Sequence, residues 1–400
     1  MKNKKELFGL LLVFGILSLF GSCTNNPNSP VGDDNYEYQI PEQINDGWET
    51  ASLSSVGLSE FKLDLMLAYL REYTNHNIHS IIIVKNNKLA FEEYYYGRKF
   101  NMAQYTGETG FNRDDTHDLC SATKSFVSAL IGIAIDKGYI QSVEQKISEF
   151  FPEYIDLFQN SALKQMITIK DLLTMSSGIQ WDDETYYYDD PRNDIYQLFR
   201  SSDPIEYILT KSIIETPGTV FAYRNCNTIL LGEIIRKATG KRIDAFAQTY
   251  LFDKLGITEL EWQMLPNNVV FCSGDLRLRP RDMAKFGQLF LDKGVWKQQR
   301  IISENWIDES VKARYLMLNS RWEDGYGYQW WTKTFSTNLN SYESYFAEGW
   351  GGQYILVFSE LNMVIVFTGG NYFDVDPVSN LLEEFILPSA NKFLLKDFDK

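Results

Sequence analysis

Residues 120–135 read CSATKSFVSALIGIAI, and this segment carries more structural information than any other part of the chain. After Lys124 the run is apolar on nearly all faces, and it stops at Gly138. A helix that is hydrophobic all round is buried on every side. The segment therefore predicts a buried central helix around which the other elements pack.

Ser121 lies at the start of this predicted helix, and Lys124 follows three residues later on the same helix face. Free backbone N–H groups and the helix dipole favour negative charge at that end. A partly desolvated lysine can lose its proton and become the base that a serine hydroxyl needs to act as a nucleophile. The alternative is that Ser121 only caps the helix and Lys124 faces water. The S-x-x-K spacing alone does not separate these two interpretations.

Strands are predicted on both sides of this helix, near the two ends of the chain. Period-two and apolar runs predict strands at 79–84 and 89–95, and again at 353–359 and 363–368. Helices are predicted from Ser59 to Tyr73 and from Val378 to Leu394, and the middle, about 120–310, is mostly helical in pattern. We expect an α/β (α+β) fold in which both chain ends complete one antiparallel sheet, with flanking helices and an inserted helical region.

The N-terminus has the pattern of an export signal. Three lysines within residues 1–6 precede an apolar run from Leu7 to Phe20 and then Gly21-Ser22-Cys23. This resembles a bacterial lipobox, so residues 1–22 are predicted to be a signal peptide and Cys23 the lipidated first residue of the mature protein. Residues 23–47 are predicted to be a flexible tether and 48–400 the domain. The alternative is simple secretion; the lipoprotein interpretation places the protein on a membrane, facing the periplasm or the cell surface.

Charge and cysteine content exclude several classes of function. The formal net charge is -15, and binding to nucleic acid needs a basic surface. Three cysteines remain after the predicted lipidation site: Cys120, Cys226 and Cys272. An odd number favours buried free thiols over a disulfide framework, although one pair among them could still be bridged. No spacing of His76 and His79 indicates a metal site.

In context, Ser121-Ala122-Thr123-Lys124-Ser125 resembles the nucleophile motif of the serine β-lactamase and penicillin-binding-protein superfamily, especially its esterase-like branch related to class C β-lactamases. Four further segments are similar to family elements in order and spacing: 168–179 (TIKDLLTMSSGI), 217–225 (PGTVFAYRN), 274–287 (GDLRLRPRDMAKFG) and 348–353 (EGWGGQ). The resemblance covers about 57–395 and implies a β-lactamase/transpeptidase-like fold.

The resemblance implies that Tyr223, in the Y-x-N motif, shares a hydrogen bond with Ser121 and Lys124 and assists proton transfer. The alternative is a core tyrosine after a Pro-Gly turn. Asn225 would orient Lys124 or the substrate amide. Arg224 replaces a smaller family residue and either lines the cleft or faces water.

The third motif carries the information about substrate. Gly351 and Gly352 allow close approach of backbone to a ligand. The resemblance implies that the N–H groups of Gln353 and Ser121 form the oxyanion hole. Trp350 stands where lactam-recognising relatives carry a lysine that pairs with the substrate carboxylate. A Trp-Gly-Gly version is similar to esterase and short-amide hydrolase members.

Other residues carry less specific expectations. His117 is expected to brace the nucleophile turn. The 186–190 segment (YYYDD) is either a cleft-edge loop or a solvated surface loop. Trp330-Trp331 is expected to supply core and one pocket wall. Lys333-Thr334 is not the third motif, because Phe335 follows in place of glycine.

The resemblance implies a serine hydrolase that cleaves a small-molecule or peptide ester or amide through an acyl-enzyme on Ser121, with no metal or cofactor. One rival is a D,D-peptidase or true β-lactamase. A rival of another class is a non-catalytic surface lipoprotein that binds a peptide or glycan in the same cleft. The natural substrate and the oligomeric state stay open.

Overall fold

The structure is a computed structural model that describes residue 36 and residues 38–101, 104–317 and 323–390. The predicted signal peptide and the lipidation site Cys23 lie outside these residues. The end of the predicted tether packs against the domain, because Tyr38 stacks on Phe91 with ring centroids 4.9 Å apart and donates a hydrogen bond to the Ala90 carbonyl. The segment from Tyr38 onward is therefore part of the folded body, and the predicted tether boundary at residue 47 was too late.

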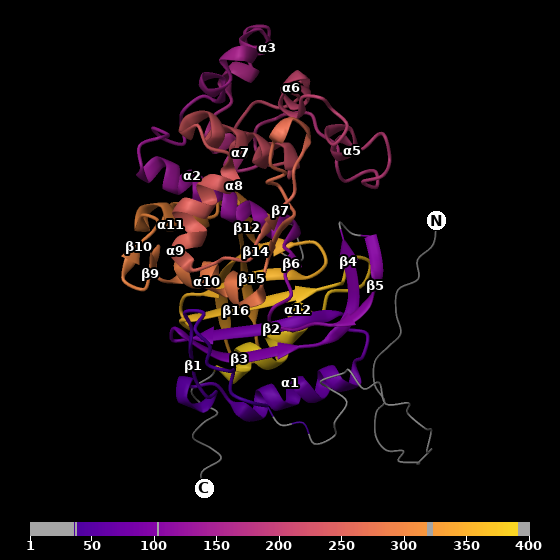
Figure 1. Ribbon diagram of the computed structural model, residues 1–400, viewed down its shortest axis with the longest axis vertical. Coiled ribbons are helices and arrows are strands. Elements are labelled where there is room, and N and C mark those ends of the chain that lie inside the picture. Colours follow the sequence, from indigo (N-terminus) through magenta and orange to yellow (C-terminus); the bar gives the residue numbers. More distant parts are fainter. Residues whose placement is uncertain (1–35, 37, 102–103, 318–322, 391–400) are drawn as a thin grey trace.

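A large sheet occupies the lower half of the molecule in Figure 1. In the described part of the chain it has nine strands, in the order β1 (Glu49–Thr50), β3 (Lys88–Tyr94), β2 (Ile78–Lys85), β16 (Met363–Gly369), β15 (Gln353–Phe358), β14 (Ser341–Gly349), β13 (Trp331–Ser336), β12 (Gly325–Tyr326) and β11 (Tyr315–Leu316). Every neighbouring pair is antiparallel except β1 and β3. Val366 of β16 lies opposite Ile82 of β2, so both chain ends complete one sheet, as the sequence predicted.

Smaller sheets surround this one. They are the hairpin β4 (Tyr96–Asn101) and β5 (Gln104–Gly110), the pair β9 (Val295–Trp296) and β10 (Gln299–Arg300), and the three strands β6 (His117–Asp118), β8 (Leu276–Leu278) and β7 (Glu261–Trp262). The third of these joins the nucleophile segment to the segment that begins at Gly274, because His117 pairs with Leu278.

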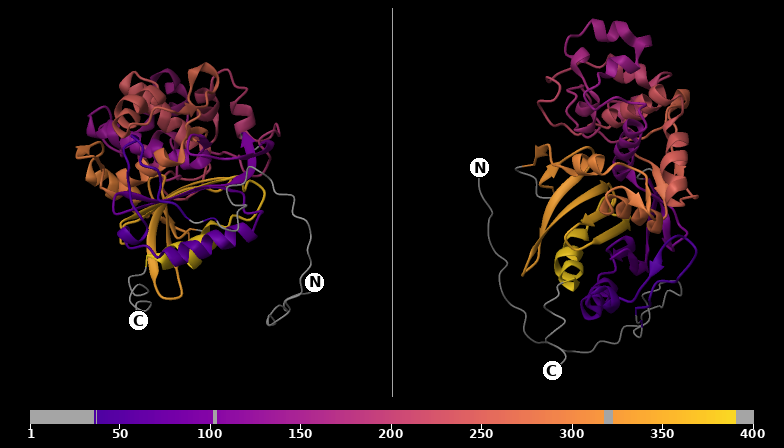
Figure 2. Two further views of the ribbon diagram at one scale, coloured as in Figure 1. Left: turned by 60° about the horizontal axis from the view of Figure 1, so that its bottom comes forward. Right: turned by 90° about the vertical axis from the view of Figure 1, so that its left-hand side faces the viewer.

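Terminal helices cover one face of the main sheet. They are α1 (Glu60–Glu72) and a continuous C-terminal run of α12 (Val378–Leu381), the π-helix η8 (Leu382–Ile386) and α13 (Leu387–Ser389). The left view of Figure 2 shows α1 in indigo beside the yellow C-terminal run, below the sheet. Ser59 caps α1 through the Lys62 N–H, as predicted. The predicted C-terminal helix is present through Ser389, and its last predicted residues lie outside the described chain.

Both faces of the sheet are buried, which explains the uninterrupted apolar runs of its central strands. In β2, Ile81 and Ile83 pack toward the terminal helices, whereas Ile82 and Val84 pack toward the inserted helical region. Helix α10 (Pro280–Leu291) lies on this second face. At Gly287 a Cβ atom would lie 2.5 Å from Val364, so only glycine allows α10 to approach the sheet this closely.

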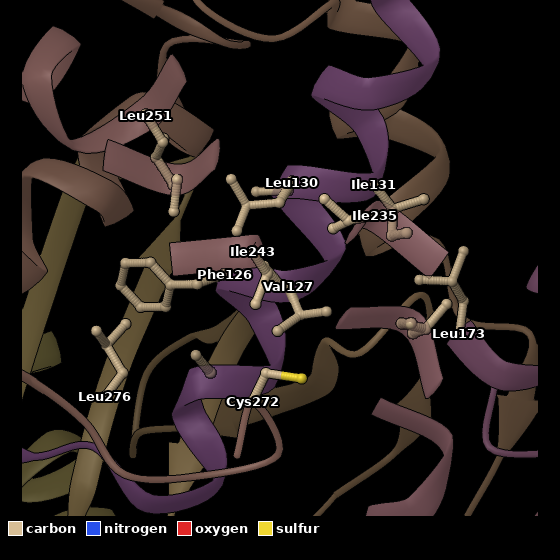
Figure 3. Close-up of a cluster of buried hydrophobic side chains, with 14 of the residues drawn as sticks. Phe126, Val127, Leu130, Ile131, Leu173, Ile235, Ile243, Leu251, Cys272 and Leu276 are labelled. Atoms are coloured by element: carbon tan, nitrogen blue, oxygen red, sulfur yellow. The ribbon is translucent and has the colours of Figure 1, made fainter. Parts of the chain in front are cut away.

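The inserted region gathers around α2 (Thr123–Asp136), in which every residue from Thr123 to Ala134 is buried. Its other helices are α3 (Ile155–Gln159), α4 (Ile169–Leu173), α5 (Asp194–Leu198), α6 (Pro204–Thr210), α7 (Asn225–Thr239), α8 (Ile243–Ala247), α9 (Asp253–Leu255) and α11 (Glu304–Val311). It also holds the 3-10 turns η3 (Ile147–Phe150), η4 (Pro152–Tyr154), η5 (Lys164–Met166) and η7 (Pro266–Asn268) and the π-helix η6 (Gln248–Phe252); η1 (Ser54–Val56) precedes α1. Figure 3 shows Phe126 and Leu130 of α2 within this core. The predicted buried central helix is confirmed.

The three cysteines in the described part of the chain are free thiols. Cys226 and Cys272 are buried, whereas Cys120 is partly exposed. Among the described residues, no helix has both the length and the apolar character that a bilayer crossing requires.

Candidate active site

Ser121 lies in a short 3-10 turn, η2 (Cys120–Ala122), that leads directly into α2. Its Oγ accepts a hydrogen bond from Lys124 Nζ at 2.9 Å. The preceding residue, Cys120, has φ of 45°, which is a strained left-handed conformation for a side chain other than glycine. The backbone N–H of Cys120 donates to Asp118 Oδ1 at 2.8 Å, and this contact helps to hold the turn.

Lys124 is only 1% exposed, and its second acceptor is the backbone carbonyl of Ser273, 2.7 Å from Nζ. A hydroxyl and a carbonyl do not compensate a buried positive charge as a carboxylate does. Burial therefore lowers the pKa of Lys124 to about 7, while the more distant Asp183 carboxylate acts to raise it. A substantial fraction of Lys124 is then a neutral amine near pH 7, poised to accept the Ser121 proton.

Tyr223 lies next to both Ser121 and Lys124. Lys124 Nζ is 4.9 Å from the centroid of the Tyr223 ring, so the amine faces the ring of the phenol. Burial raises the pKa of Tyr223 above its ordinary range, and a hydrogen bond to Ser121 acts in the opposite direction. Trp331 stacks on the Tyr223 ring, with centroids 5.7 Å apart and an interplanar angle of 18°, and fixes its orientation. The phenol thus stays protonated near neutral pH.

Asp183 anchors the start of α7 next to these groups. Its Oδ2 accepts hydrogen bonds from the Asn225 backbone N–H at 3.1 Å and from Trp181 Nε1 at 2.7 Å. Desolvation raises the pKa of this carboxyl, while the two hydrogen bonds and the charge of Lys124 lower it. Asn225 lines the cavity beside Ser121 and is held by Asp183.

The third motif, residues 348–353, begins at the end of β14, and there it contacts the turn that carries Ser121. At Gly349 a Cβ atom would lie 2.0 Å from the Leu119 carbonyl oxygen, so glycine is required for this contact. Gly351 and Gly352 both have φ of 91°, and the Gly351 carbonyl accepts from the Asn371 N–H at 2.9 Å. Gln353 follows at the start of β15, which also contacts η2. Its side chain turns away and donates to the Gly369 carbonyl at 2.7 Å.

A cavity of about 140 Å³ opens beside Ser121. Its walls are mostly apolar and include Phe199, Phe271 and Trp350. Trp350 is held in place because its Nε1 donates to the Tyr372 carbonyl at 2.9 Å. The volume is roughly that of a cavity that takes up a benzene-sized molecule. It can therefore hold a small chemical group next to Ser121, and a larger ligand would extend outward from it.

A carboxyl pair, Asp118 and Asp275, lines part of this cavity. Burial and the neighbouring Asp118 carboxylate raise the pKa of Asp275 to about 9, and the two side chains hydrogen bond to each other. Near neutral pH Asp275 therefore keeps its proton. The hydrogen bond between Asp118 and Asp275 connects the turn that carries Ser121 with the segment that supplies the Ser273 carbonyl.

The structure also places the residues for which only less specific predictions could be made from the sequence. Tyr188 lines the cavity and Tyr187 is exposed, so the 186–190 segment is both cleft edge and surface. Trp330 is buried core, while its neighbour Trp331 supports Tyr223. Arg224 neither lines the cavity nor faces water, because its side chain pairs with Glu215 at 3.1 Å and is only 11% exposed.

None of the three histidines lines the cavity beside Ser121, and neither does Lys333 or Thr334. His117 is buried in β6, with its Nδ1 3.5 Å from His79 Nδ1, and burial lowers its pKa. His76 Nδ1 accepts from the Ile78 N–H at 2.9 Å. Lys333 and Thr334 lie in β13. Within the described residues, no group of three His, Cys, Asp or Glu side chains is arranged to hold a metal ion.

Sequence reasoning missed Asp183, Ser273, Tyr372 and the Asp118–Asp275 pair as parts of this site. Asp118 lies two residues before the segment 120–135, and Ser273 lies directly before the segment 274–287. This proximity to the motifs was the sequence feature that could have identified both residues. Asp183 had no such signal, because only the packing of its loop against α7 brings it near Lys124.

Known proteins share sequence and fold with this chain. The family model described as Beta-lactamase matches residues 78–372. The 6-aminohexanoate-dimer hydrolase of Paenarthrobacter ureafaciens is 28% identical over 249 residues, which are 58% of this chain and 61% of that protein. The N-acetylmuramyl-L-alanine amidase of Bacillus subtilis (strain 168) is 25% identical over 181 residues, 44% of this chain and 40% of that protein.

The aligned stretches thus span less than two thirds of either of these relatives. Among solved structures, a family VIII carboxylesterase superposes with a TM-score of 0.63 at 15% identity, covering 88% of this chain and 100% of the other. At this identity the likeness concerns the fold alone.

Proposed function

The chain belongs to the beta-lactamase family, and from that premise we propose that it is a serine hydrolase that cleaves an ester or amide bond through an acyl-enzyme on Ser121. The observation that carries the proposal is the 2.9 Å contact between Ser121 Oγ and a buried lysine whose other acceptor is a backbone carbonyl. Such a lysine can be neutral at physiological pH, as general-base catalysis requires.

In the proposed first step, Lys124 takes the Ser121 proton as Oγ attacks the substrate carbonyl carbon. Tyr223 does not act as the general base, because burial raises its pKa and the phenol stays protonated near neutral pH. Its role is instead to keep its proton, to orient Oγ and to relay a proton from Lys124 to the leaving group. Asp183 holds the start of α7 and biases the charge of Lys124 from a distance.

The oxyanion that forms in this step is assigned to the backbone N–H groups of Ser121 and Gln353. Two features support this role: Ser121 precedes the N-terminus of α2, and β15 contacts the η2 turn. Donors fixed in place before reaction stabilise developing charge without reorganisation. Water then attacks the acyl-enzyme, with Lys124 again accepting a proton, and releases the product acid.

The substrate is proposed to be an uncharged ester or amide rather than a β-lactam or a D-alanyl peptide. Trp350 forms part of the cavity wall where lactam-recognising relatives carry a lysine, so the partner for a substrate carboxylate is replaced by an apolar ring. The name of the Paenarthrobacter relative, 6-aminohexanoate-dimer hydrolase, supports cleavage of an amide bond as one form of this activity.

The test is intact-mass measurement after incubation with a fluorophosphonate and with a panel of p-nitrophenyl esters, linear amides, β-lactams and D-alanyl peptides. We expect one fluorophosphonate adduct on the wild-type chain, none on Ser121→Ala, and turnover of esters or amides above that of lactams. Faster turnover of a chromogenic cephalosporin would instead assign a β-lactamase or peptidase. Absence of any Ser121 adduct or turnover would leave a binding protein and overturn the proposal.

A further inference from the structure

A row of aromatic rings leads away from the cavity beside Ser121. We call it the aromatic track and define it as Tyr188, Trp350, Phe373, Phe100 and Tyr105. Successive ring centroids lie 6.0 Å apart from Tyr188 to Trp350, 5.9 Å from Trp350 to Phe373, 6.2 Å from Phe373 to Phe100 and 5.8 Å from Phe100 to Tyr105. The track thus starts at two cavity-lining rings and ends on β5 of the β4–β5 hairpin.

The outer rings of the track are unusually exposed for their type. Phe373 is 65% and Tyr105 58% exposed, and Trp350 is 41% exposed. Isolated apolar side chains on a surface need no explanation, but a contiguous set that joins a catalytic cavity marks a ligand surface. Below them Phe100 packs on Tyr372 with centroids 4.5 Å apart, which holds the rings in position before any ligand arrives.

The small volume of the cavity requires such a surface. About 140 Å³ accommodates only a few heavy atoms on one side of the scissile bond. A larger substrate must therefore continue outside, and the rings of Trp350 and Phe373 form the adjacent apolar surface. Each CH₂ group buried there should strengthen substrate binding by about fourfold.

Ring geometry and charge define the chemistry of the occupant. The rings meet at steep angles, 83° between Trp350 and Phe373 and 67° between Phe100 and Tyr105, so they form edges and notches rather than one flat platform. Notches suit a flexible alkyl or aryl chain better than the flat face of a sugar ring. The charged neighbours Arg98 and Asp374 already pair with each other.

We propose that the aromatic track binds an uncharged alkyl or aryl part of the substrate whose ester or amide carbonyl reaches Ser121. This inference rests on the proposed function and deepens it. It predicts that the enzyme prefers substrates with a long apolar body over short ones with the same reacting group.

The kinetic test compares p-nitrophenyl acetate with p-nitrophenyl octanoate, the latter below its micelle concentration. In the wild-type protein kcat/KM should favour octanoate. Phe373→Ala should lower the octanoate-to-acetate ratio of kcat/KM by about tenfold, and Tyr105→Ala by about threefold, because the contact is lost only for the long chain. Val375→Ala is the matched control, because Val375 is an exposed apolar residue two positions along the chain that is outside the track; its ratio should stay within about twofold of wild type.

A binding test separates this inference from the proposed function. Calorimetry with octanamide on Ser121→Ala protein should show binding that weakens about tenfold when Phe373→Ala is added. If acetate is hydrolysed through Ser121 but neither the kinetic ratio nor octanamide binding depends on Phe373, the track inference alone fails. If octanamide binding depends on Phe373 but no ester is hydrolysed, the proposed function alone fails. Binding of a chitooligosaccharide at Trp350, with none of octanamide, would overturn the apolar assignment in favour of a glycan.

Discussion

Two lysines are buried to the same extent in this protein and have different surroundings. Lys124 of α2 and Lys285 of α10 are each 1% exposed, and each contacts a polar side chain three residues earlier. For Lys285 that side chain is Asp282, whose Oδ1 lies 2.7 Å from Nζ. For Lys124 it is the Ser121 hydroxyl.

The comparison shows that burial alone does not make a lysine reactive. A buried ammonium group next to a carboxylate is an ion pair whose loss leaves an unpaired charge. A buried lysine that has only a hydroxyl and a carbonyl as acceptors releases its proton more easily. The N-terminal end of α2 is therefore suited to chemistry, and the corresponding part of α10 is suited to holding that helix against its neighbours.

The largest expected effect is on activity. Lys124→Met should lower kcat/KM for an activated ester by about 10³-fold, because the general base is lost. Lys285→Met should leave kcat/KM per folded molecule within about threefold of wild type. Equal losses in the two variants, with both folded by circular dichroism, would contradict the assigned difference.

For stability we expect the opposite order: Lys285→Met should lower the free energy of unfolding more than Lys124→Met does. Lys285→Met should lower the free energy of unfolding by about 2 kcal/mol, because Asp282 keeps only its contact with Arg279 at 3.1 Å. Lys124→Met should change it by less than about 1 kcal/mol, because an apolar side chain of similar length replaces a buried amine that has no carboxylate in contact with it. Urea denaturation of the two variants gives both values; a larger loss for Lys124→Met would show that its amine is mainly structural.

The pH dependence of kcat/KM should also distinguish Lys124 from Lys285. The pKa of Lys124 is lowered to about 7, so its basic form is lost as the pH falls below that value. The logarithm of kcat/KM should rise with unit slope up to about pH 7 and then level. Lys285→Met should keep this midpoint, and Ser121→Ala corrects for background hydrolysis. A profile that is flat between pH 5 and 9 would rule out Lys124 as the base.

The smallest expected effect comes from Asp183. Its carboxylate acts to raise the pKa of Lys124, so Asp183→Asn should move the midpoint of the pH profile to lower pH and raise the rate at pH 6 by about two- to threefold. Asparagine keeps an oxygen that can accept from Trp181 and the Asn225 N–H. A shift to higher pH would show that Asp183 acts through position rather than charge.

Much of the fold could be predicted from local patterns. The apolar run after Lys124 and the runs in β2, β3, β15 and β16 are long enough to identify by periodicity. The strands from β11 to β14 were not predicted. Strands β11 and β12 are only two residues long, and β13 and β14 mix polar and aromatic residues in place of a continuous apolar run. The end of the tether was misplaced because Tyr38 lies in a polar stretch and is held by tertiary contacts alone.

Part of the candidate site could likewise be predicted from the sequence, and the rest could not. The resemblance to the family motifs indicated Ser121, Lys124 and Tyr223, and the structure brings all three together. Ser273 contributes only a backbone carbonyl, which leaves no trace in side-chain chemistry. The aromatic track joins residues from β4, β5 and the loops after α4, β14 and β16, and no local pattern links them.

The pairing of β16 with β2 has a consequence for biogenesis. Residues 78–85 emerge from the ribosome long before 363–369, so the middle of the main sheet stays open until nearly the whole chain has been made. Contacts this distant in sequence form slowly, and an unpaired apolar strand edge attracts other chains. A nonsense codon shortly before residue 363 should consequently yield insoluble aggregates rather than a shortened enzyme.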